Sequence, residues 1–156
     1  MHLTRELILK SKFDNILCVL RPTLIYGKGD THNGYGPNRF INLALKNKPI
    51  SIFGGGEERR DHIYIDYLVE IVIKCIQKRA IGTLNLATGQ IYSFKYLARL
   101  IINLTKSKSQ IIKIKRVGKM PHNGYRPFNI HLLKKYFQEI KIFSIKNNIK
   151  EYLEKY

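Results

Sequence analysis

The 156-residue chain has little of three features that would each mark a class of protein. Its two cysteines, Cys18 and Cys75, lie in apolar runs without metal-ligand spacing, and its five histidines form no closely spaced pair. No apolar run approaches the roughly 20 residues that span a bilayer. The N-terminus lacks the long apolar region of a secretory signal. We therefore expect a cytoplasmic protein with reduced cysteines, and neither a metal site nor a membrane partner.

Acidic residues are also scarce, since 11 of them face 28 lysines and arginines and leave a formal net charge of +17. A basic surface of this kind can bind nucleic acid. The lysines are nevertheless spread along most of the chain and accompany many Ile and Asn residues, a combination that AT-rich codons also produce. A nucleic-acid-binding module is thus a minor alternative. The densest basic cluster comprises Lys106, Lys108, Lys113, Lys115, Arg116 and Lys119.

Short apolar runs alternate with amphipathic stretches, which favours α/β layering in a single unit. The run Ile16–Leu20 is apolar throughout, as in a parallel strand covered on both faces, and Arg21-Pro22 should end it. Pro37 suits the first residue of a helix. Further strands are expected at 50–53, 83–87 and 110–115. Ser93, Asn129 and Ser144 are expected to cap helices.

The stretch from Ser51 to Tyr67 combines a glycine turn with two periodic patterns. Three consecutive glycines at 54–56 permit a tight turn, and residues 59–66 then alternate as a strand does, with Arg60 on the face opposite Arg59. A helical stripe follows, formed by Leu68, Ile71, Val72, Cys75 and Ile76, and Asp66 occupies the position expected of its N-cap. A fixed arginine can hold a phosphate through two parallel hydrogen bonds. A surface arginine on an edge strand is an equally simple interpretation of Arg60.

Two motifs in this region carry a family resemblance. One is Phe-Gly-x-Gly-x-x-x-Arg-Asp-x-Ile-x-Ile-Asp at 53–66, and the other is Arg-Pro-x-x-x-Tyr-Gly at 21–27. Together they resemble the extended short-chain dehydrogenase/reductase family, and more narrowly its NAD-dependent nucleotide-sugar epimerases and dehydratases. The resemblance runs from about Leu3 to the end. It implies the C-terminal part of a Rossmann-type parallel sheet with the small α/β substrate-binding subdomain.

The resemblance covers only the C-terminal half of such an enzyme. No Gly-x-Gly-x-x-Gly or Gly-x-x-Gly-x-x-Gly stands between a strand and a helix, so the N-terminal cofactor-binding half is expected to be absent. The catalytic Tyr-x-x-x-Lys is missing too. If Glu6 is the acidic residue that commonly follows it in the family, His2 takes the lysine position and the tyrosine would precede Met1. The sequence then reads as a gene fragment, one half of a split enzyme, or a frame started at an internal methionine.

The resemblance also assigns candidate site residues. Pro22 and Thr23 would line the cofactor, NAD or NADP, which the missing half would mainly bind. Arg60 matches the arginine that holds the nucleotide diphosphate, and Arg126 resembles the second arginine of that clamp. Leu24 stands where many members have asparagine, which weakens any precise substrate assignment.

Other residues keep two interpretations. Asn38 and Arg39 would face the nucleotide, or form only an exposed first helical turn. Arg21 could be a ligand or part of an ion pair at a strand end. Asp61, Tyr64 and Asp66 are expected to be architectural.

The expected function is therefore the nucleotide-sugar-binding portion of an NAD(P)-dependent epimerase or dehydratase. Its partners would be a nucleotide sugar and its own upstream half or a second copy. The main alternative is a non-catalytic remnant or a partner-binding subunit of a split enzyme.

Overall fold

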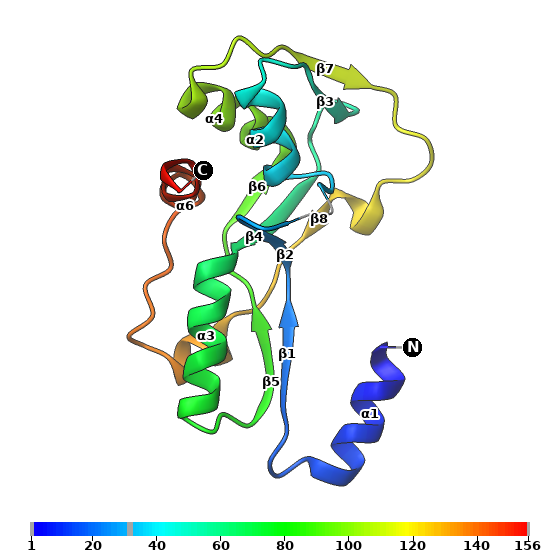
Figure 1. Ribbon diagram of the computed structural model, residues 1–156. Coiled ribbons are helices and arrows are strands. Elements are labelled where there is room, and N and C mark those ends of the chain that lie inside the picture. The colour runs from blue at the N-terminus through cyan, green and yellow to red at the C-terminus, as the bar shows by residue number, and fades with distance from the viewer. Residues whose placement is uncertain (1, 31–32, 156) are drawn as a thin grey trace.

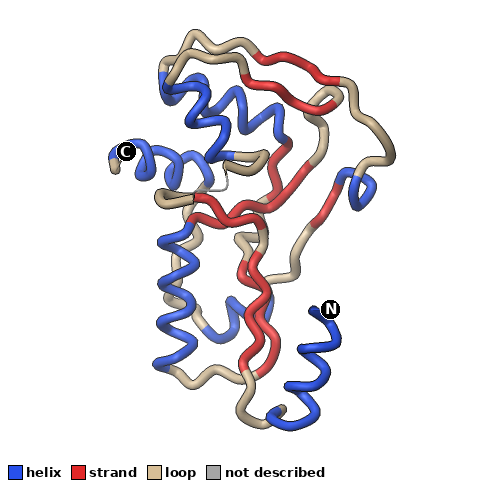
Figure 2. The backbone as a smooth tube through the Cα atoms, turned by 45° about the vertical axis from the view of Figure 1, so that its right-hand side comes forward, coloured by secondary structure: helices blue, strands red, loops and turns tan. Residues whose placement is uncertain are grey.

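The computed structural model describes residues 2–30 and 33–155, with the side chain of His2 left out. The chain folds into an α/β structure in two stacked parts, joined at one strand, β4 (Arg59–Tyr64), as Figures 1 and 2 show. This confirms the expected fold class. Within the described residues, no helix is long and apolar enough to cross a membrane, and no group of three His, Cys, Asp or Glu could hold a metal ion.

The lower part is a parallel strand pair flanked by helices. Strand β1 (Cys18–Pro22) pairs in register with β5 (Gly82–Leu86), Cys18 opposite Gly82. Helices α3 (Ile65–Gln77) and α5 (His131–Tyr136) pack on this pair. Helix α1 (His2–Phe13) precedes β1 and is tied to it by an ion pair between Arg21 and Glu6. Arg21 therefore has the ion-pair role.

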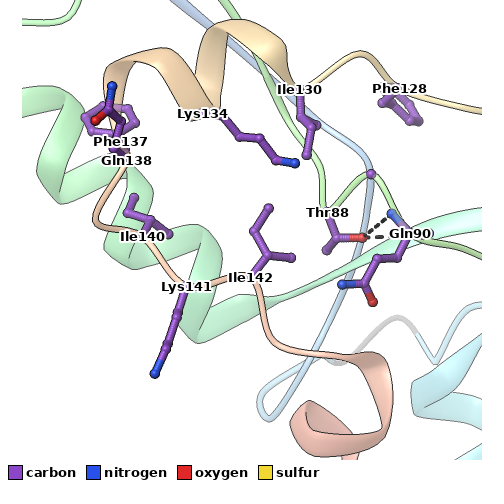
Figure 3. A pocket seen from close by; sticks show the side chains of 11 residues that line it. Thr88, Gln90, Phe128, Ile130, Lys134, Phe137, Gln138, Ile140, Lys141 and Ile142 are labelled. Atoms are coloured by element: carbon purple, nitrogen blue, oxygen red, sulfur yellow. Dashed lines mark hydrogen bonds between the residues drawn. The ribbon is translucent and has the colours of Figure 1, made fainter.

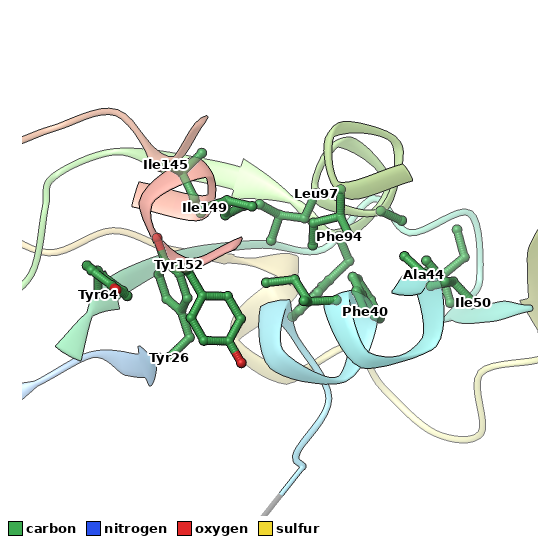
Figure 4. Packing of buried hydrophobic residues seen from close by; sticks show 14 residues of the cluster. Tyr26, Phe40, Ala44, Ile50, Tyr64, Phe94, Leu97, Ile145, Ile149 and Tyr152 are labelled. Carbon is green, nitrogen blue, oxygen red and sulfur yellow. The ribbon is translucent and has the colours of Figure 1, made fainter. Parts of the chain in front are cut away.

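The upper part is built around two short parallel strands and three helices. Strand β3 (Ile50–Phe53) pairs with β7 (Ile111–Ile114), and α2 (Pro37–Leu45), α4 (Phe94–Thr105) and α6 (Ile145–Glu154) surround the core. Figure 4 shows the aromatic and aliphatic side chains that fill it. The expected caps at Ser93 and Ser144 are present: each hydroxyl accepts a hydrogen bond from the backbone N–H three residues further along, in Tyr96 and Asn147.

Strand β4 connects the two parts because the side chains on its two faces belong to different hydrophobic cores. Ile63 belongs to the lower core and Tyr64 to the upper one. Around β4 lie β2 (Leu24–Tyr26) and β8 (Tyr125–Arg126), both parallel to it, and β6 (Ile91–Ser93), which is antiparallel. A 3₁₀ turn, η1 (Pro121–Gly124), leads into β8. These three short strands were not expected from the sequence.

Several expected element ends were wrong. Helix α3 begins at Ile65 with Tyr64 as its N-cap, so Asp66 lies in the first turn and pairs with Lys155 instead. Strand β1 includes Arg21 and Pro22, because its hydrogen bonds to β5 do not need the proline N–H. Ile76 is 73% exposed, on the outer side of the helical stripe. Asn129 lies one residue before the observed N-cap of α5, Ile130, although its side-chain oxygen accepts a hydrogen bond from His131 N–H.

The apolar surface of the lower part is incompletely covered. A groove of about 510 Å³ runs between β1 and α3 and is lined in part by Ile16, Cys18, Leu20 and Ile76. Ile16 is 69% exposed, and several side chains of α1 are exposed as well, namely Leu3, Leu7, Ile8, Leu9 and Phe13. Contiguous apolar surface of this kind marks contact sites or promotes association.

We expect the 156-residue chain, purified alone, to self-associate through this groove. Sedimentation velocity should show species larger than a monomer, and Ile16→Lys with Ile76→Lys should shift them toward the monomer. Val117→Lys serves as the control, since Val117 is 94% exposed but lies outside the groove. A monomeric wild-type chain with cooperative unfolding would show that these residues form a self-sufficient domain.

His62 is a buried titratable group of the upper core. It is 3% exposed, its ring meets Phe94 edge-on with centroids 5.7 Å apart, and within residues 2–30 and 33–155 neither ring nitrogen has a hydrogen-bond partner. Burial lowers the pKa of His62 to about 3, and the positive charge of Arg60 acts in the same direction. The ring is therefore neutral at pH 7.

This pKa makes folding sensitive to acid. The unfolded chain takes up a proton on His62 near pH 6.5, the folded chain only near pH 3, so stability falls by up to about 1.4 kcal/mol per pH unit between them. We expect His62→Phe to remove a loss of about 2 kcal/mol between pH 7 and pH 5. Urea unfolding at both values measures it, with the exposed His131→Phe as control. An unchanged pH dependence in His62→Phe would contradict the assignment.

Candidate functional site

Four of the predicted residues line one cavity of about 350 Å³ at the carboxyl end of β1. They are Pro22, Thr23, Arg60 and Arg126. Such a position, outside the carboxyl ends of parallel strands, is where α/β sheets commonly bind ligands. The wall is completed by residues from several segments, namely Leu24, Tyr35, Glu58, Phe94, Pro121, His122 and Phe128.

The two predicted arginines lie on adjacent strands and directly opposite each other. In the parallel pairing of β8 with β4, Arg126 is the register partner of Arg60. Like charges in this arrangement repel, which costs stability unless an anion lies between them. Arg60 is 7% exposed, whereas Arg126 is exposed and rests on the ring of Phe128, 5.3 Å from its centroid. The site thus has one buried and one exposed guanidinium.

Arg60 is held by neighbours on three sides. It donates to the backbone oxygens of Arg59 and Pro121, each at 2.9 Å, and forms an ion pair with the Glu58 carboxylate. The other oxygen of Glu58 accepts from Arg116 at 2.8 Å. Because Glu58 is itself 8% exposed, these contacts form a buried charged cluster beside the cavity.

Glu58 and Arg116 were not predicted as site residues. A signal for Glu58 was present, because the two-residue alternation places it on the same face as Arg60. No local signal existed for Arg116, which is 58 residues from Glu58 along the chain and stood out only as part of a basic cluster. Their contact depends on the fold.

Thr23 and Asp61 fix the geometry of the cavity floor. Thr23 Oγ1 donates to the carbonyl of Asp61 at 2.9 Å, and its N–H donates to Leu86 O. The Asp61 carboxylate accepts from the N–H groups of Thr88 and Gly89 and from the Thr88 hydroxyl. Burial raises the pKa of Asp61, and these hydrogen bonds oppose the rise. Asp61 therefore has the expected architectural role.

Asn38 lines a neighbouring cavity of about 210 Å³, which shares Leu24 and Tyr35 with the first. Its side-chain oxygen accepts from Gly27 N–H at 3.1 Å, and its amide donates to Asp30 at 2.6 Å, so it also holds the loop before α2. Arg39 is exposed and lines neither cavity. The prediction for His2 falls on a side chain outside the described residues.

A larger cavity, about 780 Å³, lies between α5, the turn after β5 and the segment before α6 (Figure 3). Thr88 and Gln90 form part of one side, and Lys134 and Lys141 extend from the others. None of the predicted site residues lines it, and its lysines come from separate segments. The arginine-lined cavity therefore remains the candidate site.

Several solved structures with the same fold are, by their names, epimerases or dehydratases of nucleotide sugars. The structure matches UDP-glucose 4-epimerase from Thermotoga maritima, solved with UDP-glucose, at a TM-score of 0.78 and 21% identity, over 97% of this chain and 50% of that one. It also matches the dTDP-glucose 4,6-dehydratase of Bacillus anthracis, solved with NAD, at a TM-score of 0.80 and 16% identity, over 97% and 48%. At these identities the likeness establishes the fold.

Sequence comparison reaches further. A dTDP-D-glucose 4,6-dehydratase from Dictyostelium discoideum is 35% identical over 83 residues, which are 47% of this chain and 19% of that protein. The chain thus spans about a fifth of this relative and about half of the matched structures. Residues 7–87, just over half of the chain, match the NAD dependent epimerase/dehydratase family. The chain belongs to this family.

Proposed function

We propose that this chain forms the nucleotide-sugar-binding part of an NAD(P)-dependent epimerase or dehydratase. The observation that carries the proposal is the pairing of Arg60 with Arg126 across adjacent strands in one cavity. Two guanidinium groups facing each other can share a diphosphate, each through charge-assisted hydrogen bonds. In the water-poor wall around Arg60 such bonds are stronger than at an open surface.

The surroundings of the arginines suit the rest of a nucleotide sugar. Tyr35 and Phe94 are in ring contact, with centroids 4.4 Å apart, and provide an apolar wall next to Arg60. Asn38 lies in the adjoining cavity, where its amide could contact polar groups of the ligand after a small rearrangement. Arg39, on the outer surface of the same helix turn, would only reach a ligand that extends beyond the cavity.

Pro22 and Thr23 fit a role beside the nicotinamide ring. The hydroxyl and N–H of Thr23 are used within the protein, so the pair offers a proline ring and a methyl group to a flat ring, together with a rigid backbone. NAD or NADP, when bound, would accept a hydride from the sugar and later return it. The residues of this chain would orient the sugar nucleotide by its diphosphate while that exchange takes place.

The cofactor itself would be bound mainly by a dinucleotide-binding segment that these 156 residues do not include. We propose that such a segment, in the same or a separate polypeptide, completes the enzyme. A non-catalytic remnant that only binds a nucleotide sugar or a partner is the alternative. Activity on co-expression with an upstream reading frame that carries the glycine motif and Tyr-x-x-x-Lys would support the enzyme.

We expect the isolated chain to be catalytically silent. No tyrosine precedes Arg21 in the sequence, so no phenolate of the family type can act as the base. Incubation with NAD and UDP-, GDP- and dTDP-sugars should give no product by chromatography. Turnover by the purified chain would overturn this account of the missing base.

We expect Arg60→Ala and Arg126→Ala each to weaken UDP-glucose binding by about 1.5–3 kcal/mol, the usual worth of a charge-assisted hydrogen bond. Arg59→Ala is the matched control, because it removes the same charge from an exposed side chain on the opposite face of β4. Isothermal titration calorimetry measures the three affinities. Equal losses from Arg59→Ala and Arg60→Ala would mean that net charge, not the cavity, governs binding.

A further inference from the structure

Glu58 places a negative charge where the proposed ligand would carry its own. Its carboxylate lies in the wall of the arginine-lined cavity and is ion-paired with Arg60, the residue assigned to the diphosphate. A buried carboxylate is usually unfavourable next to an anion site. Its presence there calls for a physical explanation.

The hydrogen bonds of Arg60 show how strongly Glu58 competes. A guanidinium has five N–H donors, two of them on each terminal nitrogen. One terminal nitrogen of Arg60 donates to both Glu58 and the Pro121 carbonyl, so both of its N–H groups are used. The end-on grip of an oxyanion takes one N–H from each terminal nitrogen. A phosphate held in this two-point way must therefore displace a partner, and the Glu58 side chain can move more readily than the backbone.

Arg116 is an alternative ion-pair partner for the displaced Glu58 carboxylate. It already donates to the second oxygen of Glu58 at 2.8 Å, and its side chain is 18% exposed with the guanidinium over the ring of Phe53. Its Nε is buried and makes no hydrogen bond to any described residue. Glu58 can thus leave Arg60 and take up this donor without becoming an unpaired buried charge, which would be costly.

We propose that Glu58 is an internal competitor that sets the charge of the anion the cavity accepts; this rests on the proposed function. Arg60, Arg126 and Glu58 line the cavity, and Arg116 lies behind Glu58 as its ion-pair partner; these four groups together carry two net positive charges. That balance matches the roughly two negative charges of a nucleotide diphosphate sugar. An anion with a single charge pays the same cost of displacing Glu58 but gains less attraction. The common cost therefore leaves a singly charged anion with little net affinity, while a diphosphate still binds.

The test compares Glu58→Gln with Glu57→Gln. Both remove one carboxylate from adjacent positions, but Glu57 is exposed and does not line the cavity. Calorimetric titration with inorganic pyrophosphate and with acetate, at fixed salt, gives the affinities. We expect Glu58→Gln to bind pyrophosphate about tenfold more tightly, as for one charge-assisted hydrogen bond. We also expect acetate to gain by no larger a factor, because both anions are relieved of the same cost, while Glu57→Gln stays at the wild-type values.

An unchanged or weaker affinity for pyrophosphate in Glu58→Gln would overturn the proposal, because Glu58 would then only position Arg60. If Glu58→Gln does not fold by circular dichroism, Arg116→Gln replaces it. Loss of Arg116 leaves Glu58 on Arg60, so pyrophosphate should bind about tenfold more weakly than in Lys115→Gln, an exposed control that loses the same charge. Equal affinities of these two variants would likewise overturn it.

A titration with UDP-glucose separates this inference from the proposed function. If the wild-type chain binds UDP-glucose no better than pyrophosphate, the nucleotide-sugar assignment fails. The comparison of Glu58→Gln with Glu57→Gln still decides whether Glu58 competes with anions, since it uses pyrophosphate alone.

Discussion

The buried carboxylate of Asp61 is the contact on which the arrangement of the two parts depends. This carboxylate accepts hydrogen bonds from Thr88 and Gly89, just after β5. The backbone carbonyl of Asp61 accepts from Thr23, just after β1. The lower strand pair is thereby fixed to β4 of the upper part. A buried charge that lost these donors would be strongly unfavourable, so the junction holds only in this geometry.

The site follows from that junction. Because Asp61 fixes β4, its neighbour Arg60 projects from the opposite face of the strand at a set position, into the cavity next to Pro22 and Thr23. Alternation along a strand thus places one residue in the architectural junction and the next in the cavity wall. The acid sensitivity of His62 has the same origin, since this face is buried against the upper core.

Short-range signals in the sequence were enough to predict many helices and strands. Contacts between residues far apart in the chain could not be predicted from it. Ser93 and Ser144 cap helices as expected, because a hydroxyl before an apolar stripe is a short-range signal. Asp66 gave the same kind of signal, but the prediction was wrong: Tyr64, the last residue of β4, is the N-cap, and the aspartate pairs with Lys155. The family motif located Arg60, but its ion pair with Glu58 required the three-dimensional structure.

The two arginines of the cavity belong to very different strands. Arg60 belongs to a six-residue strand shared by both cores, whereas Arg126 belongs to β8, a two-residue strand at the end of a long peripheral segment. That segment, from the end of β7 to the start of α5, contributes to neither buried core before Ile130. A change in this segment therefore acts on Arg126 directly and on Arg60 only through the Pro121 carbonyl and the Arg116–Glu58 pair. The position of Arg126 can thus change without loss of buried core contacts, while the strand that carries Arg60 is fixed by both cores.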